Sequence, residues 1–352
     1  MDCTENKIEF LGFDNITVNE DFLKKVKYGT PAILALGLCL NSGCLFDCIY
    51  CYAKNSANVI NKKMNLDLYK KVLLEAQNNG CKTVIITGVS SPSEPLQSPL
   101  LIEIVKLAYS LQMRTVIYTN AYVLGNDTLC QKIHNIRSID FAKFLFNSDV
   151  SLMISCDSIF EEDYNKIVRF NAFSTYIKAE KILLDVGYKG NKVSDCIKTR
   201  IAISTVISKI NYKYLQKMQE YFHQKNWQFI CKFPSLMGNA VKNENLFFNS
   251  DEVRKLRSTT SEKYSDKQET LAVTDKDNNK YCLINQFGLA IDGEGKMLSC
   301  LSGIPILNDK SVYDYPISEL IIEKRKLYPI KAGVCPKKLK YYSFKENENE
   351  NL

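Results

Sequence analysis

The chain has 352 residues, of which 45% are hydrophobic and 11% aromatic, and its formal net charge is +7. These values are typical of a folded globular protein and exclude an intrinsically disordered chain. No apolar run approaches the roughly 20 residues that a helix needs to cross a bilayer, so we expect no membrane span. The excess of lysine and arginine is modest and spread among acidic residues, which indicates a solvated surface and does not favour a nucleic-acid partner.

Thirteen cysteines occur in the chain, an odd number at irregular spacing. This pattern does not fit a secreted disulfide framework, and the first 27 residues lack the apolar stretch of a secretory signal. We therefore expect a cytoplasmic protein whose cysteines are free, buried or bound to metal. The chain has two histidines, His134 and His223. With so few, we expect neither a histidine-based metal centre nor a serine hydrolase triad.

From residue 33 onward, short apolar runs typical of buried strands alternate with segments whose apolar residues recur every three or four positions. The predicted strands are residues 33–39, 83–88, 115–119, 150–156, 199–206 and 227–233. The predicted helices between and after them are residues 66–78, 100–111, 128–134, 175–186 and 212–223. Alternating strands and helices predict an α/β fold with a parallel sheet, and periodicity alone leaves open whether that sheet is doubly wound or a partial barrel.

The composition divides the chain into five predicted parts. They are an N-terminal extension at 1–30 with a short amphipathic piece around Phe22 to Val26, a core at 31–240, a polar linker at 241–280 with one helix over 251–265, a small domain at 281–340, and a disordered tail at 341–352. Within the small domain, Asp292-Gly293 between apolar runs predicts a hairpin, and residues 317–322 predict a helix.

Three cysteines, Cys44, Cys48 and Cys51, lie within eight residues at C-x3-C-x2-C spacing. Thiolates this close in sequence suit an iron–sulfur cluster or zinc, and a closed site normally needs four such ligands. Three ligands from one loop therefore leave one coordination position open. Cys39 could complete a four-thiolate zinc site, but it ends the first apolar run and is more simply a small core residue.

The stretch resembles the cluster loop of the radical S-adenosylmethionine (radical SAM) superfamily, C-x3-C-x-aromatic-C, with Tyr50 as the aromatic residue. The resemblance implies an open, TIM-like (β/α)6 partial barrel in which Cys44, Cys48 and Cys51 hold a [4Fe–4S] cluster. It further implies that S-adenosylmethionine chelates the open iron and is cleaved reductively to a 5′-deoxyadenosyl radical, which abstracts hydrogen from a substrate. A flavodoxin-type or ferredoxin-type electron donor is the partner implied.

Polar residues that follow later strands resemble the cosubstrate-binding segments of this superfamily. Ser93-Glu94-Pro95 resembles its "GGEP" segment, although Pro92 and Ser93 stand where glycines are common. The residues that the resemblance implies for cosubstrate binding are Tyr50, Ser93, Glu94, Asn120, Ser155, Asp157, Ser204 and Asn211. Several of these polar residues could equally be helix N-caps, because Asn, Ser and Asp are favoured where a helix starts after a strand.

Near the C-terminus, Cys282, Gly295 and Cys300 reproduce the C-x(9–15)-G-x4-C element of the SPASM and twitch domains, and Cys335 falls where their closing cysteines begin. No cysteine follows Cys335, so the resemblance implies an α+β twitch-like domain with at most one auxiliary iron–sulfur cluster on Cys282, Cys300 and Cys335. The fourth position is left for water, substrate or a residue such as Cys231. The alternative is that these are buried cysteines of a small β-element.

The resemblance implies an oxidoreductase or maturase, with oxidative modification of a peptide or protein as the favoured reaction. One alternative is a radical SAM dehydrogenase or cyclase that acts on a small metabolite such as a sugar or nucleotide. Another, of a different class, is a non-catalytic zinc-binding or iron–sulfur electron-transfer protein. No residue in the sequence selects the substrate.

Overall fold

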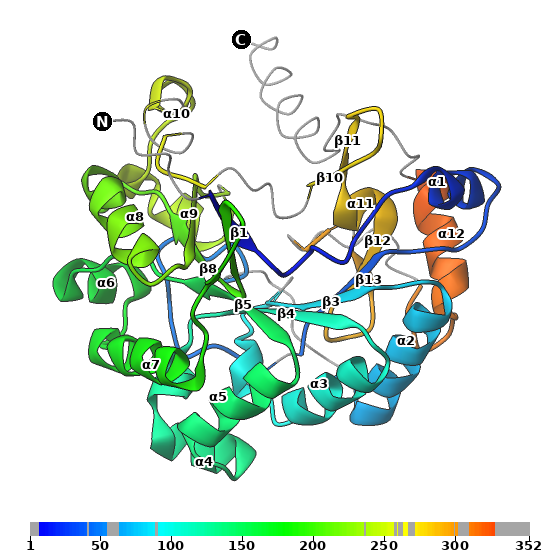
Figure 1. Cartoon of the computed structure of the whole chain (residues 1–352), viewed down its shortest axis with the longest axis horizontal. Coiled ribbons are helices and arrows are strands. Elements are labelled where there is room, and N and C mark those ends of the chain that lie inside the picture. The colour runs from blue at the N-terminus through cyan, green and yellow to red at the C-terminus, as the bar shows by residue number, and fades with distance from the viewer. Residues whose placement is uncertain are drawn as a thin grey trace.

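The computed structural model describes residues 7–40, 42–54, 63–88, 91–235, 237–256, 259, 263–266, 272–298, 300–301 and 310–327. In these residues the main sheet has eight strands in the order β13-β12-β2-β3-β4-β5-β8-β9 (Figure 1). Neighbouring strands are parallel except for the antiparallel pair β12–β13. The strands are β2 (Ala35–Leu38), β3 (Thr83–Ile86), β4 (Arg114–Thr119), β5 (Val150–Ser155), β8 (Ile201–Val206), β9 (Gln228–Lys232), β12 (Gly288–Ile291) and β13 (Met297–Leu298).

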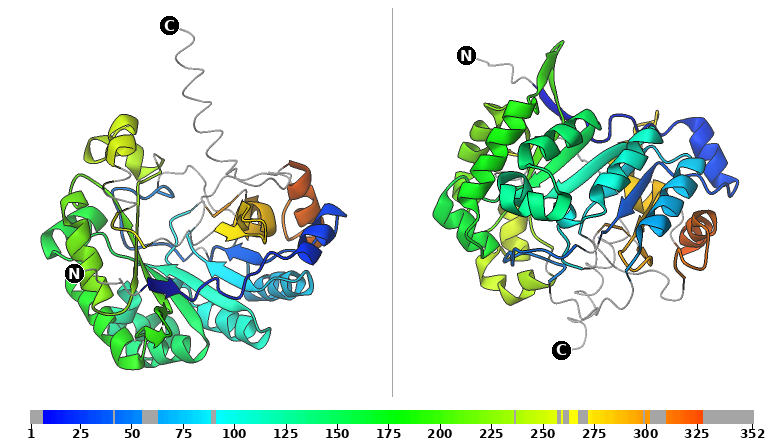
Figure 2. Two further views of the ribbon diagram at one scale, coloured as in Figure 1. Left: turned by 45° about the horizontal axis from the view of Figure 1, so that its top comes forward. Right: turned by 90° about the horizontal axis from the view of Figure 1, so that it is seen from below.

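Helices surround the outer face of this curved sheet (Figures 1 and 2). They are α2 (Leu66–Asn78), α3 (Leu101–Ser110), α4 (Asp127–His134), α5 (Ser138–Asn147), α6 (Glu161–Val168), α7 (Phe173–Val186) and α8 (Leu215–His223), with the 3-10 turns η2 (Tyr122–Gly125) and η3 (Tyr212–Tyr214). Side chains alternate along each strand: in β5, Leu152 and Ile154 pack in the outer layer with the helices, whereas Met153 belongs to a second apolar cluster inside the sheet. The α/β partial barrel predicted from the sequence is confirmed.

The N-terminal segment fills the barrel at the amino ends of the strands. It contains β1 (Lys7–Phe10) and α1 (Glu20–Lys27), and β1 forms a small sheet with β7 (Cys196–Thr199) and β6 (Asn191–Val193). Phe10 and Val18 are buried in the same inner cluster as Val116 and Met153. The predicted amphipathic piece is present as α1, whereas β1 was not predicted, because its pairing with β7 joins distant parts of the chain.

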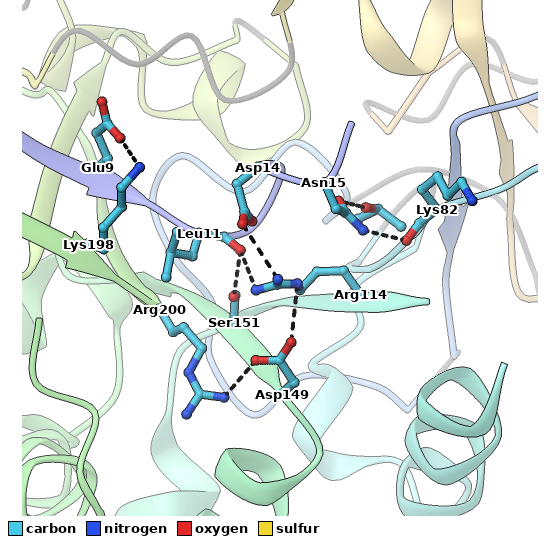
Figure 3. Close-up of polar contacts among 11 residues, drawn as sticks. Glu9, Leu11, Asp14, Asn15, Lys82, Arg114, Asp149, Ser151, Lys198 and Arg200 are labelled. Carbon is cyan, nitrogen blue, oxygen red and sulfur yellow. Dashed lines mark hydrogen bonds and ion pairs between the residues drawn. The ribbon is translucent and has the colours of Figure 1, made fainter. Parts of the chain in front are cut away.

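Arginines hold this segment against the strand starts (Figure 3). Arg114, the first residue of β4, donates to the carbonyl oxygen of Leu11 at 2.8 Å and pairs with Asp14 and Asp149 at 3.6 and 3.4 Å. Arg200 pairs with the same Asp149 at 3.1 Å. These contacts occupy the amino ends of the strands, so the carboxyl ends are left for chemistry, as in other parallel α/β barrels.

The C-terminal part of the chain extends the barrel sheet. Its elements are α9 (Asn239–Lys242), η4 (Glu244–Leu246), α10 (Ser250–Leu256), β10 (Ala272–Thr274), β11 (Lys280–Cys282), α11 (Leu283–Phe287), β12, β13 and α12 (Ile317–Leu327). The expected hairpin at Asp292-Gly293 is confirmed as β12–β13. Because β12 pairs in parallel with β2, the sheet continues across the boundary that we predicted at residue 281.

Some sequence predictions were wrong or incomplete. The helix predicted over 251–265 ends at Leu256, and residues 263–266 form a turn and bend. The sequence did not predict α5, α6 or the short helices α9 and α11. Helix α5 follows α4 after only three residues, at a break where Asn135 takes a left-handed backbone conformation with φ 58°. Cys335 and the predicted tail at 341–352 lie outside the described residues. No helix in the described parts is long and apolar enough to span a membrane.

Candidate active site

The loop after β2 carries Cys44, Cys48 and Cys51 at the carboxyl edge of the sheet. Its apolar residues Phe46 and Ile49 are buried, while all three cysteines keep partial solvent access. Burial, with a smaller contribution from Glu94, raises the pKa of Cys44 to about 12. Burial also raises the pKa of Cys48 and of Cys51, so ligation of these thiols to a metal must release protons.

A turn after β9, which contains Gly238, packs against the backbone of this loop. Gly238 has φ 57° and ψ −126°, and a β-carbon there would lie 2.5 Å from the carbonyl oxygens of Cys51 and Tyr52. Its neighbour Asn239 donates from the backbone to the carbonyl of Cys51 at 2.9 Å and from its side chain to the carbonyl of Cys48 at 3.0 Å. The sequence did not identify Gly238 or Asn239 as part of the site; the glycine was the available signal for this close approach.

Glu94 lies on the neighbouring strand end and is almost completely buried. Its Oε1 accepts hydrogen bonds from the backbone N–H of Leu96 at 3.2 Å and from Thr119 Oγ1 at 2.5 Å, and its Oε2 accepts from the N–H of Asn120 at 2.8 Å. Burial raises the pKa of Glu94 to about 7, although these donors favour its ionised form. Glu94 thus caps the 3-10 turn η1 (Pro95–Gln97). A helix cap and a binding residue for the cosubstrate are compatible roles for this side chain.

Ser93 and Asn120 connect Glu94 to the cysteine loop. Ser93 Oγ lies 2.9 Å from Ser42 Oγ and accepts the backbone N–H of Ser42 at 3.1 Å. The Asn120 side-chain amide points to Cys44 Sγ at 3.9 Å. The structure therefore brings three of the predicted residues, Ser93, Glu94 and Asn120, to the cysteines from two separate strands.

On the other side of the loop, Tyr50 donates a 2.6 Å hydrogen bond to Asp157 Oδ2. Asp157 Oδ1 accepts the backbone N–H of Val206 at 2.7 Å, and burial raises the pKa of Asp157 to about 6. Ser155 and Ser204 are register partners on the adjacent strands β5 and β8. Tyr50, Asp157, Ser155 and Ser204 therefore lie at one end of the inner face, close to the cysteine loop.

Asn211 differs from the other predicted residues because it is completely buried. Its amide donates to the carbonyl oxygens of Asp157 and Val206 at 2.8 and 2.9 Å, and its Oδ1 accepts the backbone N–H of Ser208 at 2.8 Å. This geometry favours a structural role in which Asn211 fixes the ends of β5 and β8.

Cys39 does not join the other three cysteines. It has no solvent exposure, belongs to the inner apolar cluster, and its Sγ lies 3.9 Å from Ser91 Oγ. Among the described residues, no group of three or more His, Cys, Asp or Glu side chains is arranged to hold a single metal ion. The burial of Cys39 in the inner apolar cluster does not support the four-thiolate zinc site, and the assignment of Cys44, Cys48 and Cys51 as cluster ligands stays a prediction from the spacing of the loop.

Comparison with known proteins agrees with this geometry. Residues 38–219, just over half of the chain, match the model of the Radical SAM superfamily. The chain belongs to the radical SAM superfamily. Its cofactors are accordingly a [4Fe–4S] cluster and S-adenosylmethionine, and its activity is that of a radical SAM enzyme. No curated protein matches the sequence.

Solved structures are similar to this radical SAM protein in fold. Streptococcus suis SuiB bound to precursor peptide SuiA superposes with a TM-score of 0.59 at 15% identity, covering 86% of this chain and 67% of that one. Native anSMEcpe with bound AdoMet gives a TM-score of 0.50 at 17% identity, covering 82% of this chain and 80% of that one. At these identities the comparisons show the shared fold alone.

A tyrosine of the radical SAM core that we did not predict as functional joins the core to the C-terminal region. Tyr52, one residue after Cys51, points its hydroxyl at the carbonyl oxygens of Gly88 at 2.6 Å and Leu301 at 3.1 Å. Burial raises the pKa of Tyr52, and the nearby Cys51 and Cys300 add to the effect. Tyr52 therefore lies between the radical SAM cysteine loop and the second predicted cysteine group. Sequence spacing gave no signal for this contact.

The second cysteine group of this radical SAM protein is only partly within the described residues. Cys282 ends β11 immediately before α11, and Cys300 packs against the inner apolar cluster; both are partly exposed. Cys231 belongs to the outer cluster, whereas its neighbour Ile230 packs with the inner one. Cys231 and Cys300 are thus on different faces of the sheet, so the structure does not support Cys231 as a fourth ligand. Cys335 lies outside the described residues.

Proposed function

We propose that this radical SAM enzyme oxidatively modifies a peptide or protein, with Cys44, Cys48 and Cys51 holding the [4Fe–4S] cluster. The observation that carries the proposal is the convergence of Glu94, Asn120 and Asp157, from three different strand ends, on the loop of the three cysteines. When bound, the cluster and S-adenosylmethionine supply a 5′-deoxyadenosyl radical that abstracts a hydrogen atom from the substrate. The barrel must then bind the cosubstrate in one orientation and exclude water.

Glu94 has the free acceptor capacity to bind the amino group of the cosubstrate. A carboxylate offers about four lone-pair sites. Three are used by the donors from Leu96, Thr119 and Asn120, and the remaining one is on Oε2. A charge-assisted bond from an ammonium group at that position would also hold Glu94 ionised, which offsets the effect of burial on its pKa.

Asp157 is suited to the ribose hydroxyls by the same count. Each of its oxygens accepts one protein hydrogen bond, from Tyr50 or Val206, and keeps capacity for one more. Two acceptors on one rigid carboxylate match a vicinal diol. Ser155 and Ser204, beside it on the inner face, add hydroxyl groups that can donate or accept.

The C-terminal cysteines Cys282, Cys300 and Cys335 would hold one auxiliary cluster, which favours a net oxidation over simple hydrogen transfer. A peptide substrate is supported by the similar fold of SuiB, whose solved structure holds the precursor peptide SuiA. A flavodoxin-type or ferredoxin-type protein would supply the electron, and the cytoplasm would supply the reducing environment that free cysteines need.

The test begins with metal analysis of the whole chain, purified and reconstituted without oxygen. About eight irons per chain, falling to about four in a Cys282→Ala/Cys300→Ala variant, would support two four-iron clusters. About four irons in both would retain the radical core and refute the auxiliary cluster. About one zinc without sulfide would refute the cluster assignment altogether.

Reaction products test the substrate class. The reduced enzyme should cleave S-adenosylmethionine to 5′-deoxyadenosine, and incubation with candidate peptides should yield a product lighter by two hydrogen atoms in mass spectrometry. A Cys44→Ala variant is the matched control for both measurements. Cleavage that responds to a sugar or nucleotide, and to no peptide, would refute the proposed substrate class.

A further inference from the structure

The loop of the three cysteines presents a large apolar side chain to solvent. Leu45, which directly follows Cys44, is 47% exposed, whereas Phe46 and Ile49 of the same loop are buried. A single exposed leucine is ordinary on a protein surface, so its surroundings decide what it indicates.

The loop is joined to helices α6 and α9 by hydrogen bonds. Asp47 and Ile49 donate from the backbone to the carbonyl oxygens of Val168 and Ile167 at 3.1 and 2.9 Å, at the end of α6. Asn239, the first residue of α9, donates from its side chain to Asp47 Oδ1 at 2.9 Å. The loop, the end of α6 and α9 therefore form one continuous part of the surface.

Four basic residues belong to this part of the surface. Lys166 and Arg169 lie at the end of α6, Lys242 ends α9, and Lys54 closely follows the last cysteine. Arg169 and Lys54 both approach Asp47, at 3.4 and 3.9 Å, so the carboxylate of the loop is already paired. Lys166 and Lys242 are exposed. The charge that is left for a partner here is therefore positive.

Acidic residues near this surface do not cancel that charge. Glu244 follows α9 and offsets one lysine, whereas residues 161–163 place their carboxylates in the first turn of α6, roughly 10 Å along the helix from Arg169. Val241, beside Lys242, is a second apolar residue with 55% of its surface exposed. Exposed apolar groups thus lie among cations on this side of the loop.

A radical SAM enzyme receives one electron from another protein, and the rate of electron transfer falls steeply with distance. The donor must therefore approach the cysteine loop closely, and Leu45 is covalently adjacent to a predicted cluster ligand. A reduced flavin held near a protein surface can offer its apolar dimethylbenzene edge to such residues. Acidic side chains around that edge would complement the four cations and guide the encounter.

We propose that a basic face, defined below, is the docking site of an acidic flavodoxin-type electron donor. The basic face consists of Leu45, Lys54, Lys166, Arg169, Val241 and Lys242. The flavin is oxidised by one electron and the cluster is reduced by one, and no bond is made or broken. The inference rests on the proposed function, because it requires a cluster on the cysteine loop. The competing explanation is a solvated surface that binds no partner.

The first experiment measures binding by calorimetry, with a purified bacterial flavodoxin of net negative charge, in its oxidised form, titrated into the full chain. The parent is compared with Lys166→Glu/Lys242→Glu and with the matched control Lys24→Glu/Lys25→Glu on α1, which lies on the opposite side of the molecule from α6 and α9 (Figures 1 and 2). We expect Kd to rise about tenfold or more in the first variant and to stay near the parent value in the control. Binding by the parent should weaken as salt is added. Equal affinities in all three chains, or no binding by the parent at low salt, would overturn the inference.

The second experiment separates docking from damage to the loop. Formation of 5′-deoxyadenosine by the reconstituted chains is measured with reduced flavodoxin and, separately, with dithionite, a small reductant that needs no docking surface. Lys166→Glu/Lys242→Glu should slow the flavodoxin-supported reaction alone, whereas equal slowing with both reductants would overturn the inference. The proposed function can fail separately: a parent that binds flavodoxin but cleaves no S-adenosylmethionine with dithionite would refute the enzyme assignment, and the calorimetry would still decide the docking site.

Discussion

Gly238→Ala is the most direct perturbation of how the cysteine loop is held. The backbone of Gly238, at φ 57° and ψ −126°, is one that L-residues rarely adopt, and forcing it costs roughly 1–3 kcal/mol. A new β-carbon would also lie 2.5 Å from the carbonyl oxygens of Cys51 and Tyr52 and 2.6 Å from that of Lys54. Overpacking of this kind costs about 1–3 kcal/mol more. The described conformation of the cysteine loop should therefore be destabilised by roughly 2–6 kcal/mol.

Since about 1.4 kcal/mol corresponds to a tenfold change in an equilibrium constant, the fraction of molecules with the cysteine loop in this conformation should fall roughly 30-fold or more. The assay is iron per chain and 5′-deoxyadenosine formation after anaerobic reconstitution with limiting iron. The free energy of unfolding of the cluster-free protein should change less than this, because the loop can detach without opening the barrel.

Gly29→Ala is the matched control. Gly29 also has a positive φ of 82°, but a β-carbon there would have no atom within 4 Å. It should cost about 1 kcal/mol in unfolding free energy and leave iron binding unchanged. If Gly238→Ala bound iron and cleaved S-adenosylmethionine as well as Gly29→Ala, the close contact between the β9 turn and the cysteine loop would be unimportant, and the reasoning would be refuted.

Three further outcomes are expected. Glu94→Gln removes the charge and at least one acceptor from a buried site, at about 1–3 kcal/mol, so S-adenosylmethionine should bind roughly 5- to 140-fold more weakly by calorimetry; unchanged affinity would contradict the assigned role. In a double-mutant cycle, Tyr50→Phe and Asp157→Asn should couple by about 1–3 kcal/mol in cosubstrate binding, and strictly additive effects would show that their 2.6 Å hydrogen bond is unimportant. Hydrogen bonds, of which the one from Lys198 has the largest effect, lower the pKa of Glu9 from its ordinary 4.5 to about 2. The ionised Glu9 therefore stabilises the fold fully above pH 4.5, and this stabilisation is lost as the pH falls toward 2. Urea unfolding should show Glu9→Gln less stable by about 1 kcal/mol at neutral pH, a difference that shrinks through this window; a constant difference would refute the assignment.

Local sequence patterns predicted the parts of the fold that depend on local interactions. Helix α2 begins and ends where its apolar periodicity does. Its start is fixed by Asn65, which caps the first turn by accepting the N–H of Leu68 at 2.9 Å. The apolar runs located the six barrel strands to within two residues at most ends. Pairings between distant segments left no such pattern: nothing in the run Gly288–Ile291 indicates that it joins the sheet beside β2.

The candidate site divides in the same way. The spacing of Cys44, Cys48 and Cys51 identified the cluster loop, because all three ligands come from one short segment. The contacts that orient it cross the whole chain, as with Tyr52 and the carbonyl of Leu301, and they depend on tertiary packing. The burial of Lys324 in α12 could not be predicted either: only 3% of its surface is exposed, whereas a lysine in an amphipathic helix is normally expected to be exposed.

The pairing of β12 with β2 has a consequence for the order in which the protein is made. Strand β2 emerges from the ribosome before its partner β12, which follows about 250 residues later. At ordinary rates of synthesis, β2 waits roughly 10–50 s for that neighbour. During this interval one side of β2 has open backbone hydrogen-bonding groups, and the three-cysteine loop continues directly from it. The sheet beside the cysteine loop can therefore be completed only after residues 288–291 have been made.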